Sequence, residues 1–221
     1  MDTSDSSGRL RISAIDALVL LRNAADEVVV PYDPRLFITT AKGNKISRST
    51  ILIGHKQIVL QRNVVLLRDV IIRGDIERVN IGRYVHVARG AVLRPAYFLR
   101  RIAAATESAP PKRALRFCAF RIGKHVMIGE EAIVEAKIVG GGGVYIGRRA
   151  IIGRGAILKD YCWICDGAVL PPLSMVPNFA IMAGIPAVQV GELPECAPEL
   201  ARERCERRYE NFQPVTPAKR S

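Results

Sequence analysis

The chain has 221 residues, of which 49% are hydrophobic and 6% aromatic, and it carries a formal net charge of +12. This length is sufficient for one domain with a sizeable core. No run of about 18 apolar residues is present to span a membrane, and the acidic start argues against a secretory signal. Because no basic helix, aromatic stacking array or RNA-binding signature accompanies the positive charge, we expect an acidic protein partner rather than nucleic acid.

The five cysteines are odd in number and lack the spacing of a disulfide framework, so we expect a reduced, cytosolic compartment. Cys162 and Cys165 have the spacing of a zinc or redox pair, but no second pair of ligands accompanies them. Cys162 also falls at a position that the repeat described below predicts to be buried. We therefore predict that it is a core thiol.

Residues 1–31 lack the repeat of the later chain, and they run from a Ser- and Asp-rich start into a stretch containing Ala and Leu. We predict that this N-terminal extension is weakly ordered or forms a short helix. From Tyr32 the chain changes character. A strand is predicted at residues 37–40, a turn at residues 42–45 and a further strand at residues 46–53.

Six-residue units begin at Leu60 and are clearest at residues 146–187, where residues 146–181 read IGRRAI, IGRGAI, LKDYCW, ICDGAV, LPPLSM and VPNFAI. The first residue of each unit is Ile, Leu or Val, and the fifth is small or β-branched. This period is typical of a parallel β-helix, in which three short strands make one triangular coil. We predict a mainly β protein, a single-domain left-handed parallel β-helix over residues 32–193, whose first and fifth residues point inward.

Two loop insertions interrupt the predicted β-helix. Residues 94–121 contain three prolines and seven basic residues against one Glu107, and they predict a basic loop that leaves the coil. Its candidate partner-binding residues are Arg100, Arg101, Lys112, Arg113 and Arg116. Residues 140–143 are four glycines, and because they lack the Lys-Ser/Thr pair and following helix of a phosphate-binding loop, they predict a flexible insertion.

The repeat ends at residues 183–187, where Gly184 and Pro186 terminate strand pairing. A C-terminal helix is predicted at residues 194–213, because Pro198 suits a first turn and acidic residues lie near its start. One stripe of this helix is expected to pack on the β-helix: Ala197, Ala201, Cys205 and Tyr209. Residues 214–221 are predicted to be a tail.

Hexapeptide folds host two enzyme activities, acyl transfer that uses a histidine at a subunit interface and zinc-dependent hydration of carbon dioxide. The run Arg73-Gly74-Asp75 resembles the γ-carbonic-anhydrase family, which carries these residues in the same coil position. By that resemblance, the three zinc-ligand histidines correspond to Arg94, Glu130 and Glu135. A zinc site needs about three protein donors such as His. The resemblance therefore implies the scaffold without its metal, and we expect no catalytic residue and no cofactor.

The three histidines are His55, His86 and His125. His55 and His125 fall at predicted corners and His86 ends its unit, so we predict that all three are solvated surface residues. An acyltransferase would need one of them beside a groove that holds a cofactor. Nothing in the sequence marks such a groove.

A second resemblance extends from Tyr32 to Pro214. It is carried by residues 40–45 (TAKGNK), 71–75 (IIRGD), 92–95 (VLRP), 153–154 and 158–160 (GR and LKD), 169–172 (VLPP) and 191–196 (GELPEC). The last run is the most distinctive, because it lies outside the repeat and fold alone would not produce it. These residues resemble the dynactin subunit 5 family, β-helical proteins at the pointed end of dynactin, the activator complex for cytoplasmic dynein.

This resemblance implies a non-enzymatic, cytoplasmic, cytoskeleton-associated subunit that helps bind cargo adaptors for dynein-driven microtubule transport. Its implied partners are a second β-helical dynactin subunit similar to subunit 6, an actin-related protein, other pointed-end subunits and cargo adaptors. Nucleic-acid binding and direct membrane insertion are not implied. The N-terminal extension, the basic loop and the four glycines depart from the family's pattern. A γ-carbonic-anhydrase-like protein and a hexapeptide acyltransferase remain the alternatives.

Overall fold

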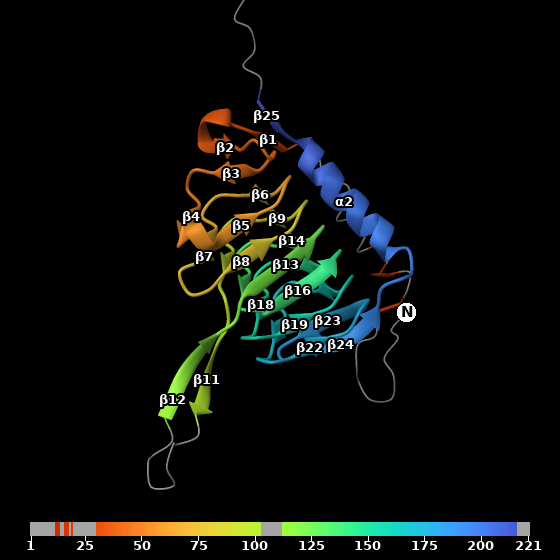
Figure 1. Ribbon diagram of the computed structural model, residues 1–221. Helices are drawn as coiled ribbons and strands as arrows, with labels where there is room; N and C mark the ends of the chain where they lie inside the picture. Colours follow the sequence, from red (N-terminus) through yellow and green to blue (C-terminus); the bar gives the residue numbers. More distant parts are fainter. Residues whose placement is uncertain (1–11, 14–15, 18, 20–29, 103–111, 216–221) are drawn as a thin grey trace, which may run out of the picture.

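The computed structural model describes residues 12–13, 16–17, 19, 30–102 and 112–215. The chain winds into a left-handed parallel β-helix, and one long helix, α2 (Ala197–Asn211), lies along its outside (Figure 1). This confirms the predicted fold. Most of the predicted N-terminal extension and residues 216–221 of the predicted tail lie outside the described residues.

Three sheets form the faces of the β-helix. The open face consists of β4 (Ile51–Ile53), β7 (Ile71–Arg73), β10 (Val92–Leu93), β15 (Ile133–Val134), β18 (Ile151–Ile152) and β21 (Val169–Leu170). The basic face consists of β5 (Ile58–Leu60), β8 (Val79–Ile81), β13 (Phe120–Lys124), β16 (Ile138–Gly142), β19 (Ile157–Leu158) and β22 (Met175–Val176).

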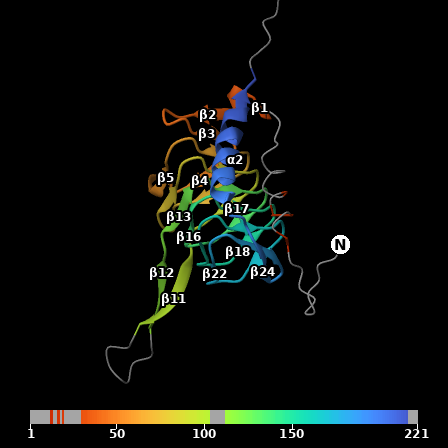
Figure 2. The ribbon, with the colours of Figure 1, turned by 90° about the vertical axis from the view of Figure 1, so that its right-hand side faces the viewer.

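The third sheet is the helix-covered face, because α2 runs along it (Figure 2). Its parallel strands are β3 (Lys45–Ser47), β6 (Val65–Leu66), β9 (His86–Val87), β14 (Met127–Ile128), β17 (Tyr145–Ile146), β20 (Trp163–Ile164) and β23 (Ala180–Gly184). At its two ends, β2 (Phe37–Thr39) and β24 (Ala187–Glu192) pair antiparallel with β3 and β23. Two short 3-10 helices, η1 (Pro34–Leu36) and η2 (His55–Gln57), lie in the first coils.

The core is a stack of the predicted inward residues. Ile128, Ile146 and Ile164 pair in register from coil to coil, at the spacing of about 4.8 Å that separates neighbouring strands. All three are fully buried, and so are the fifth-position residues Ala150 and Ala156. The confirmed alternation explains why the interior needs so few aromatic residues, since each coil encloses only a narrow prism of Ile, Val, Leu and Ala.

The predicted register is wrong in the unit that begins at Val134. The turn after Val134 is one residue shorter than its neighbours, so Ala136 takes the buried position and Val139 the next one. Ile138, predicted to point inward, therefore lies half-buried on the basic face. Ile76 is also only partly buried, in the longer corner that leads from β7 to β8.

The excursion predicted as a loop at residues 94–121 contains a β-hairpin. Strands β11 (Tyr97–Ile102) and β12 (Lys112–Phe117) pair antiparallel and project away from the β-helix (Figure 1). The repeat resumes at Phe120 rather than at Ile122, because Phe120 is fully buried and pairs with Val79 of the coil below. The hairpin stands on the coil at its base, where the ring of Phe98 lies over Gly155.

The four glycines predicted as a flexible insertion are not a separate loop, because Gly140, Gly141 and Gly142 belong to β16. The carboxylate of Asp160 accepts hydrogen bonds from the backbone N–H groups of Gly141 and Gly142, the latter at 3.2 Å. Gly143 has a φ of +64°, and a Cβ there would lie 3.1 Å from the Cβ of Ala201 and closer still to the ring of Tyr161. Glycine at this position allows α2 to approach the coil.

Both ends of the helix-covered face are closed by additional pairing. The C-terminal helix ends at Asn211 instead of the predicted residue 213, and β25 (Phe212–Pro214) pairs in parallel with β1 (Val30–Tyr32). Helical geometry ends there because Phe212 stacks on Tyr32, with ring centroids 4.4 Å apart. At the other end, the N–H of Ile12 donates to the carbonyl of Val190 at 2.8 Å.

Candidate protein-binding surfaces

Helix α2 packs on the helix-covered face of the β-helix. Ala197, Ala201 and Cys205 are buried, which confirms three members of the predicted stripe. The fourth, Tyr209, is partly buried and donates its hydroxyl to the carbonyl of Gly43 at 2.8 Å. The side chain of Lys45 donates to the carbonyl of Tyr209 at 3.1 Å, next to the Tyr209 ring. This face is therefore already occupied by the chain itself.

The prediction that all three histidines are solvated is wrong for two of them. His86 on β9 is 5% exposed, and its Nε2 accepts a hydrogen bond from Arg208 Nε at 3.2 Å. His125 stacks on Tyr84, and its Nε2 lies 3.4 Å from the Glu206 carboxylate. Sequence reasoning missed these contacts because both partners lie on α2, more than 80 residues further along the chain. His55 is exposed, as predicted.

Burial lowers the pKa of both covered histidines. For His86 the pKa lies well below 6.5, through burial first and the neighbouring positive charge of Arg208 second. For His125 burial lowers the pKa, while the Glu206 carboxylate opposes this shift. His86 lines a pocket of about 370 Å³ beside α2 and His125 one of about 200 Å³, but the Nε2 atom of each imidazole already faces an α2 side chain, Arg208 for His86 and Glu206 for His125.

Arg204 is a buried cation that the sequence analysis did not single out. It is 2% exposed and lies beneath α2, with its guanidinium carbon 5.2 Å from the Trp163 ring centroid and 5.4 Å from that of Tyr145. None of its three nitrogens has a hydrogen-bond partner within the described part of the chain. Burial lowers its pKa below the ordinary value of an arginine. Its contacts are thus with aromatic rings.

The positions that correspond to zinc ligands in the γ-carbonic-anhydrase family hold an ion-pair cluster. Arg94 pairs with Glu135, and Arg154 Nε approaches the other Glu135 oxygen at 3.5 Å. Arg154 also stacks on Tyr97 at the base of the hairpin, 3.9 Å from the ring centroid. The single carboxylate of Glu135 is therefore already shared by two guanidinium groups. Glu130 is partly buried at a different corner. Within the described residues, no three His, Cys, Asp or Glu side chains are grouped to hold a metal.

The five cysteines are free thiols in the structure. Cys162 is fully buried, as predicted, and burial raises the pKa of its thiol to about 12. Cys165 is partly buried on the other side of the strand, and burial raises its pKa as well. Both groups are protonated at neutral pH, so neither is a thiolate that would bind a metal or act as a nucleophile.

The open face carries a continuous row of apolar side chains, one from each of its six strands. We call it the apolar ladder: Ile51, Ile71, Val92, Ile133, Ile151 and Val169. The residues pair in register from coil to coil. Ile51 is 50% exposed and Ile151 41%, while the other four are partly exposed. No helix of the described chain lies over this row. Most of its members are the sixth residue of one six-residue unit in each coil. Because a coil contains three units, the row can be found in the sequence by grouping the units in threes.

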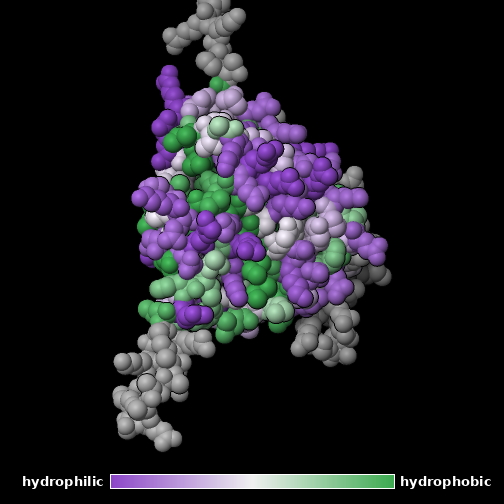
Figure 3. All heavy atoms as spheres, in the orientation of Figure 1, coloured by the Kyte–Doolittle hydropathy of each residue, from purple (hydrophilic) through white to green (hydrophobic). Residues whose placement is uncertain are grey.

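The hairpin presents a second apolar surface. Tyr97 pairs with Phe117, and Leu99 pairs with Leu115, so these four residues share one side of the two-stranded sheet. All four are exposed, Leu99 by 63%. Figure 3 shows hydrophobic residues gathered near the point where the hairpin leaves the β-helix, whereas hydrophilic residues cover α2. In the sequence the cations of this segment are conspicuous, whereas its apolar side becomes evident only when the two strands pair.

The predicted partner-binding cations lie on the same hairpin. Arg100 and Arg101 fall in β11, and Lys112 and Arg113 fall in β12, with Arg101 paired to Arg113. Arg116 pairs with Phe98 and is exposed. Their role in partner binding stays a prediction.

The comparison with protein families decides what these surfaces belong to. The family model described as dynactin subunit 5 matches residues 27–218. The chain belongs to the dynactin subunit 5 family. A curated relative, dynactin subunit 5 of Dictyostelium discoideum, is 36% identical over 187 residues, which are 85% of this chain and 88% of the relative. Membership of this family connects the chain to the cytoskeleton and to microtubule-based transport.

Solved structures show the same fold in other families. A hexapeptide transferase family protein from Anaplasma phagocytophilum superposes with a TM-score of 0.53 and 16% identity, over 76% of this chain and 89% of that one. At this identity the likeness concerns the β-helix alone.

The described part of this dynactin subunit 5 family member contains no helix long and apolar enough to cross a membrane.

Proposed function

We propose that this dynactin subunit is a non-enzymatic, structural one, and that its open face binds a second β-helical dynactin subunit. The observation that carries the proposal is the apolar ladder, which runs the length of the open face and has no partner in the described chain. Contiguous apolar rows of this kind on a soluble protein mark interaction sites, because leaving them in water is unfavourable.

A second β-helix suits the apolar ladder better than a globular partner. Stacked coils repeat every 4.8 Å or so in any β-helix, so ridges on a second flat face would fit between those of this one. None of the six ladder residues is charged. Docking along this row therefore removes apolar area from water without desolvating an ion. Each ladder residue that becomes fully buried should contribute up to about 1 kcal/mol to the free energy of binding.

The non-enzymatic part of the proposal is supported by how the candidate groups are already engaged. Arg94 and Glu135 pair with each other where a zinc ligand set would be required. The Nε2 atoms of His86 and His125 are already engaged by Arg208 and Glu206 of α2. The acyltransferase alternative is left with His55, which is exposed on η2 and makes no ion pair with a carboxylate among the described residues.

Further partners are part of the same proposal. We infer a cytoplasmic, cytoskeleton-associated protein that contacts an actin-related protein and other pointed-end subunits and contributes to binding cargo adaptors. The projecting hairpin supports this role, because its exposed apolar side and the exposed Arg116 lie on strands that reach beyond the β-helix.

Co-expression with a second β-helical dynactin subunit tests the proposal. Light scattering should show a one-to-one heterodimer for the wild type, and Ile133→Lys should abolish it by placing an ammonium group in the centre of the apolar ladder. Leu173→Lys is the matched control, because Leu173 is 69% exposed at a corner outside the ladder. A homotrimer that ignores the second subunit, or equal losses in the two variants, would contradict the proposal.

A further inference from the structure

A second surface follows from how the chain turns at the corner beside α2. One residue of each coil adopts a positive φ there: Gly43, Asn63, Tyr84, His125, Gly143, Tyr161 and Phe179. In the first four of these coils the residue just before the turn is basic, namely Lys42, Arg62, Arg83 and Lys124. We call these four residues the cation ladder.

Backbone hydrogen bonds hold the cation ladder in register. The N–H of Asn63 donates to the carbonyl of Lys42 at 3.2 Å, and the N–H of Tyr84 donates to that of Arg62 at 3.2 Å. The N–H of His125 donates to the carbonyl of Arg83 at 2.9 Å. The four positive side chains therefore rise from adjacent coils, about 4.8 Å apart along the backbone, over a length of about 14 Å.

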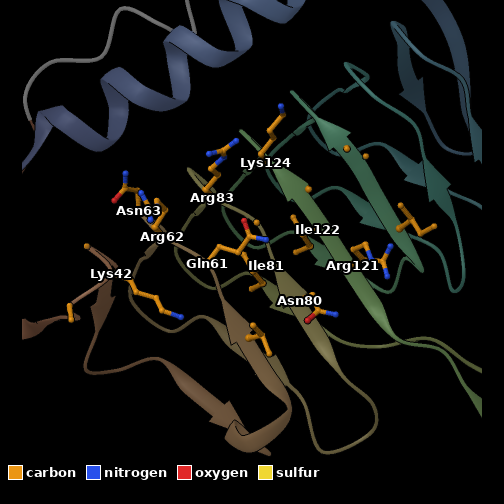
Figure 4. A pocket seen from close by; sticks show the side chains of 18 residues that line it. Lys42, Gln61, Arg62, Asn63, Asn80, Ile81, Arg83, Arg121, Ile122 and Lys124 are labelled. Carbon is orange, nitrogen blue, oxygen red and sulfur yellow. The ribbon is translucent and has the colours of Figure 1, made fainter.

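Within the described residues, these cations have no counter-charge. All four side chains are exposed, and no carboxylate of the described residues lies within salt-bridge distance of any of them. Arg121 on β13 adds a fifth positive charge to the same groove (Figure 4). Four or five like charges so close together repel one another, and a bound anion would relieve this repulsion.

The groove beside the cation ladder is large and open. Its volume is about 1440 Å³, and neither an acidic nor an aromatic residue lines it. Gly82, Gly123 and Gly140 form part of the floor, where the coils are so close that a Cβ on Gly123 would collide with the Gly140 carbonyl. The absence of side chains along this strip leaves room for a polypeptide backbone.

The next corner of the same β-helix shows that this arrangement is not a property of every corner. The equivalent residues there are Arg68, Arg89, Glu130, Arg148 and Asp166, whose charges are mixed. Arg148 pairs with Asp166 at 3.3 Å. Four consecutive coils of one sign therefore distinguish the cation ladder from the rest of the basic surface, although its row continues with Gly142 and Asp160.

We propose that the cation ladder and its groove bind an acidic, extended segment of a partner polypeptide. About four residues of extended chain span the 14 Å or so of the ladder, which suits a short run of Glu or Asp. An acidic peptide fits better than single-stranded nucleic acid, because the lining offers no aromatic ring on which a base would stack. The proposal concerns a different face from the apolar ladder and stands independently of it.

Fluorescence anisotropy with a labelled oligoglutamate peptide of about twelve residues tests the proposal on the full-length chain. We expect saturable binding that weakens steeply as salt is added, and no binding of the matched oligoglutamine peptide. Arg62→Glu/Arg83→Glu should weaken binding at least about tenfold, because two central attractive charges become repulsive. Arg68→Glu/Arg89→Glu changes the net charge equally on the neighbouring corner and should weaken it less than about threefold.

Three outcomes would overturn the proposal. Equal losses in the two charge-reversal variants would show that net charge alone attracts the peptide. Equal binding of oligoglutamate and oligoglutamine would remove the electrostatic basis. Tighter binding of a single-stranded oligonucleotide than of oligoglutamate at the same salt concentration would replace the acidic polypeptide by nucleic acid.

If Arg62→Glu/Arg83→Glu fails to fold, Lys42→Gln/Lys124→Gln should still weaken binding severalfold, and unchanged binding would contradict the proposal.

Discussion

Arg208 on α2 donates its Nε–H to Nε2 of His86 on β9 across 3.2 Å, and the His86 side chain is buried while Arg208 is partly exposed. The acceptor nitrogen must be unprotonated for this bond to form, so His86 is neutral in the folded protein. Burial, together with the charge of Arg208, keeps its pKa well below 6.5. The unfolded chain has the ordinary value. The folded state therefore binds fewer protons than the unfolded state below about pH 6.5, and stability falls as the pH falls.

We predict that the melting temperature of the wild type decreases between about pH 7 and pH 5, and that His86→Gln reduces this decrease. Glutamine accepts a hydrogen bond without titrating. His55→Gln is the control, because His55 is exposed and should leave the pH profile unchanged. Thermal unfolding followed by circular dichroism measures all three proteins. A His86→Gln profile that runs parallel to the wild type would show that His86 is not the titrating group.

The buried guanidinium of Arg204 predicts an unusual stability change. It has no nitrogen or oxygen partner among the described residues and contacts the rings of Trp163 and Tyr145 instead. Arg204→Met keeps most of the volume and removes the desolvated charge, so we expect unfolding free energy to stay equal or rise by about 1 kcal/mol. Arg204→Ala leaves a cavity and should lower it by about 2 kcal/mol. Chemical denaturation distinguishes these results, and a large loss in Arg204→Met would reveal a charge interaction that the ring contacts do not describe.

A substitution in the stacked core should lower the free energy of unfolding strongly, whereas one at an exposed corner should not. Ile152 is fully buried between Val134 and Leu170 of the adjacent coils. Ile152→Ala should lower the free energy of unfolding by about 2–5 kcal/mol, and Ile152→Lys by more, because an unpaired ammonium group would be buried. Arg89→Ala, at an exposed corner, should stay within about 0.5 kcal/mol. Equilibrium denaturation with urea measures the three variants. Wild-type stability in soluble Ile152→Lys would contradict the register.

The ion-pair cluster predicts that the purified protein carries no stoichiometric zinc at the corresponding coil positions and does not hydrate carbon dioxide. The positive guanidiniums of Arg94 and Arg154 both lie against the carboxylate of Glu135, so a cation approaching that carboxylate would be repelled. Metal analysis by mass spectrometry measures the zinc content, and an assay of carbon dioxide hydration measures the activity. About one zinc per chain, lost in Glu135→Ala, would contradict the prediction.

Much of the fold is predictable from the sequence because the repeat is local. Each inward residue, such as Ile146 or Ile164, is determined by its place in its own unit, and stacking then repeats the pattern along the axis. The short turn at Ala136 is not evident in the sequence, because both Ile138 and Val139 are apolar and either could point inward. In the structure Val139 is buried and Ile138 is only partly buried. The α2 stripe was predictable for the same local reason, since its four-residue spacing lies within one helix.

The surfaces were less predictable, because they depend on residues far apart in the chain. The environment of His86 is set by Arg208, and the covered state of His125 by Glu206. The cation ladder brings Lys42 and Lys124 to one corner only because the coils stack. Its members are isolated basic residues in the sequence, whereas the dense cations of residues 94–121 are conspicuous there.

Affinity purification of the full-length chain from its own cells, followed by mass spectrometry, tests the central claim most directly. We expect a second β-helical subunit, an actin-related protein and other dynactin components to co-purify with the wild type. Ile133→Lys should lose the β-helical subunit, and Leu173→Lys should retain it. Recovery of the wild type without dynactin components, as a symmetric homo-oligomer, would contradict the claim.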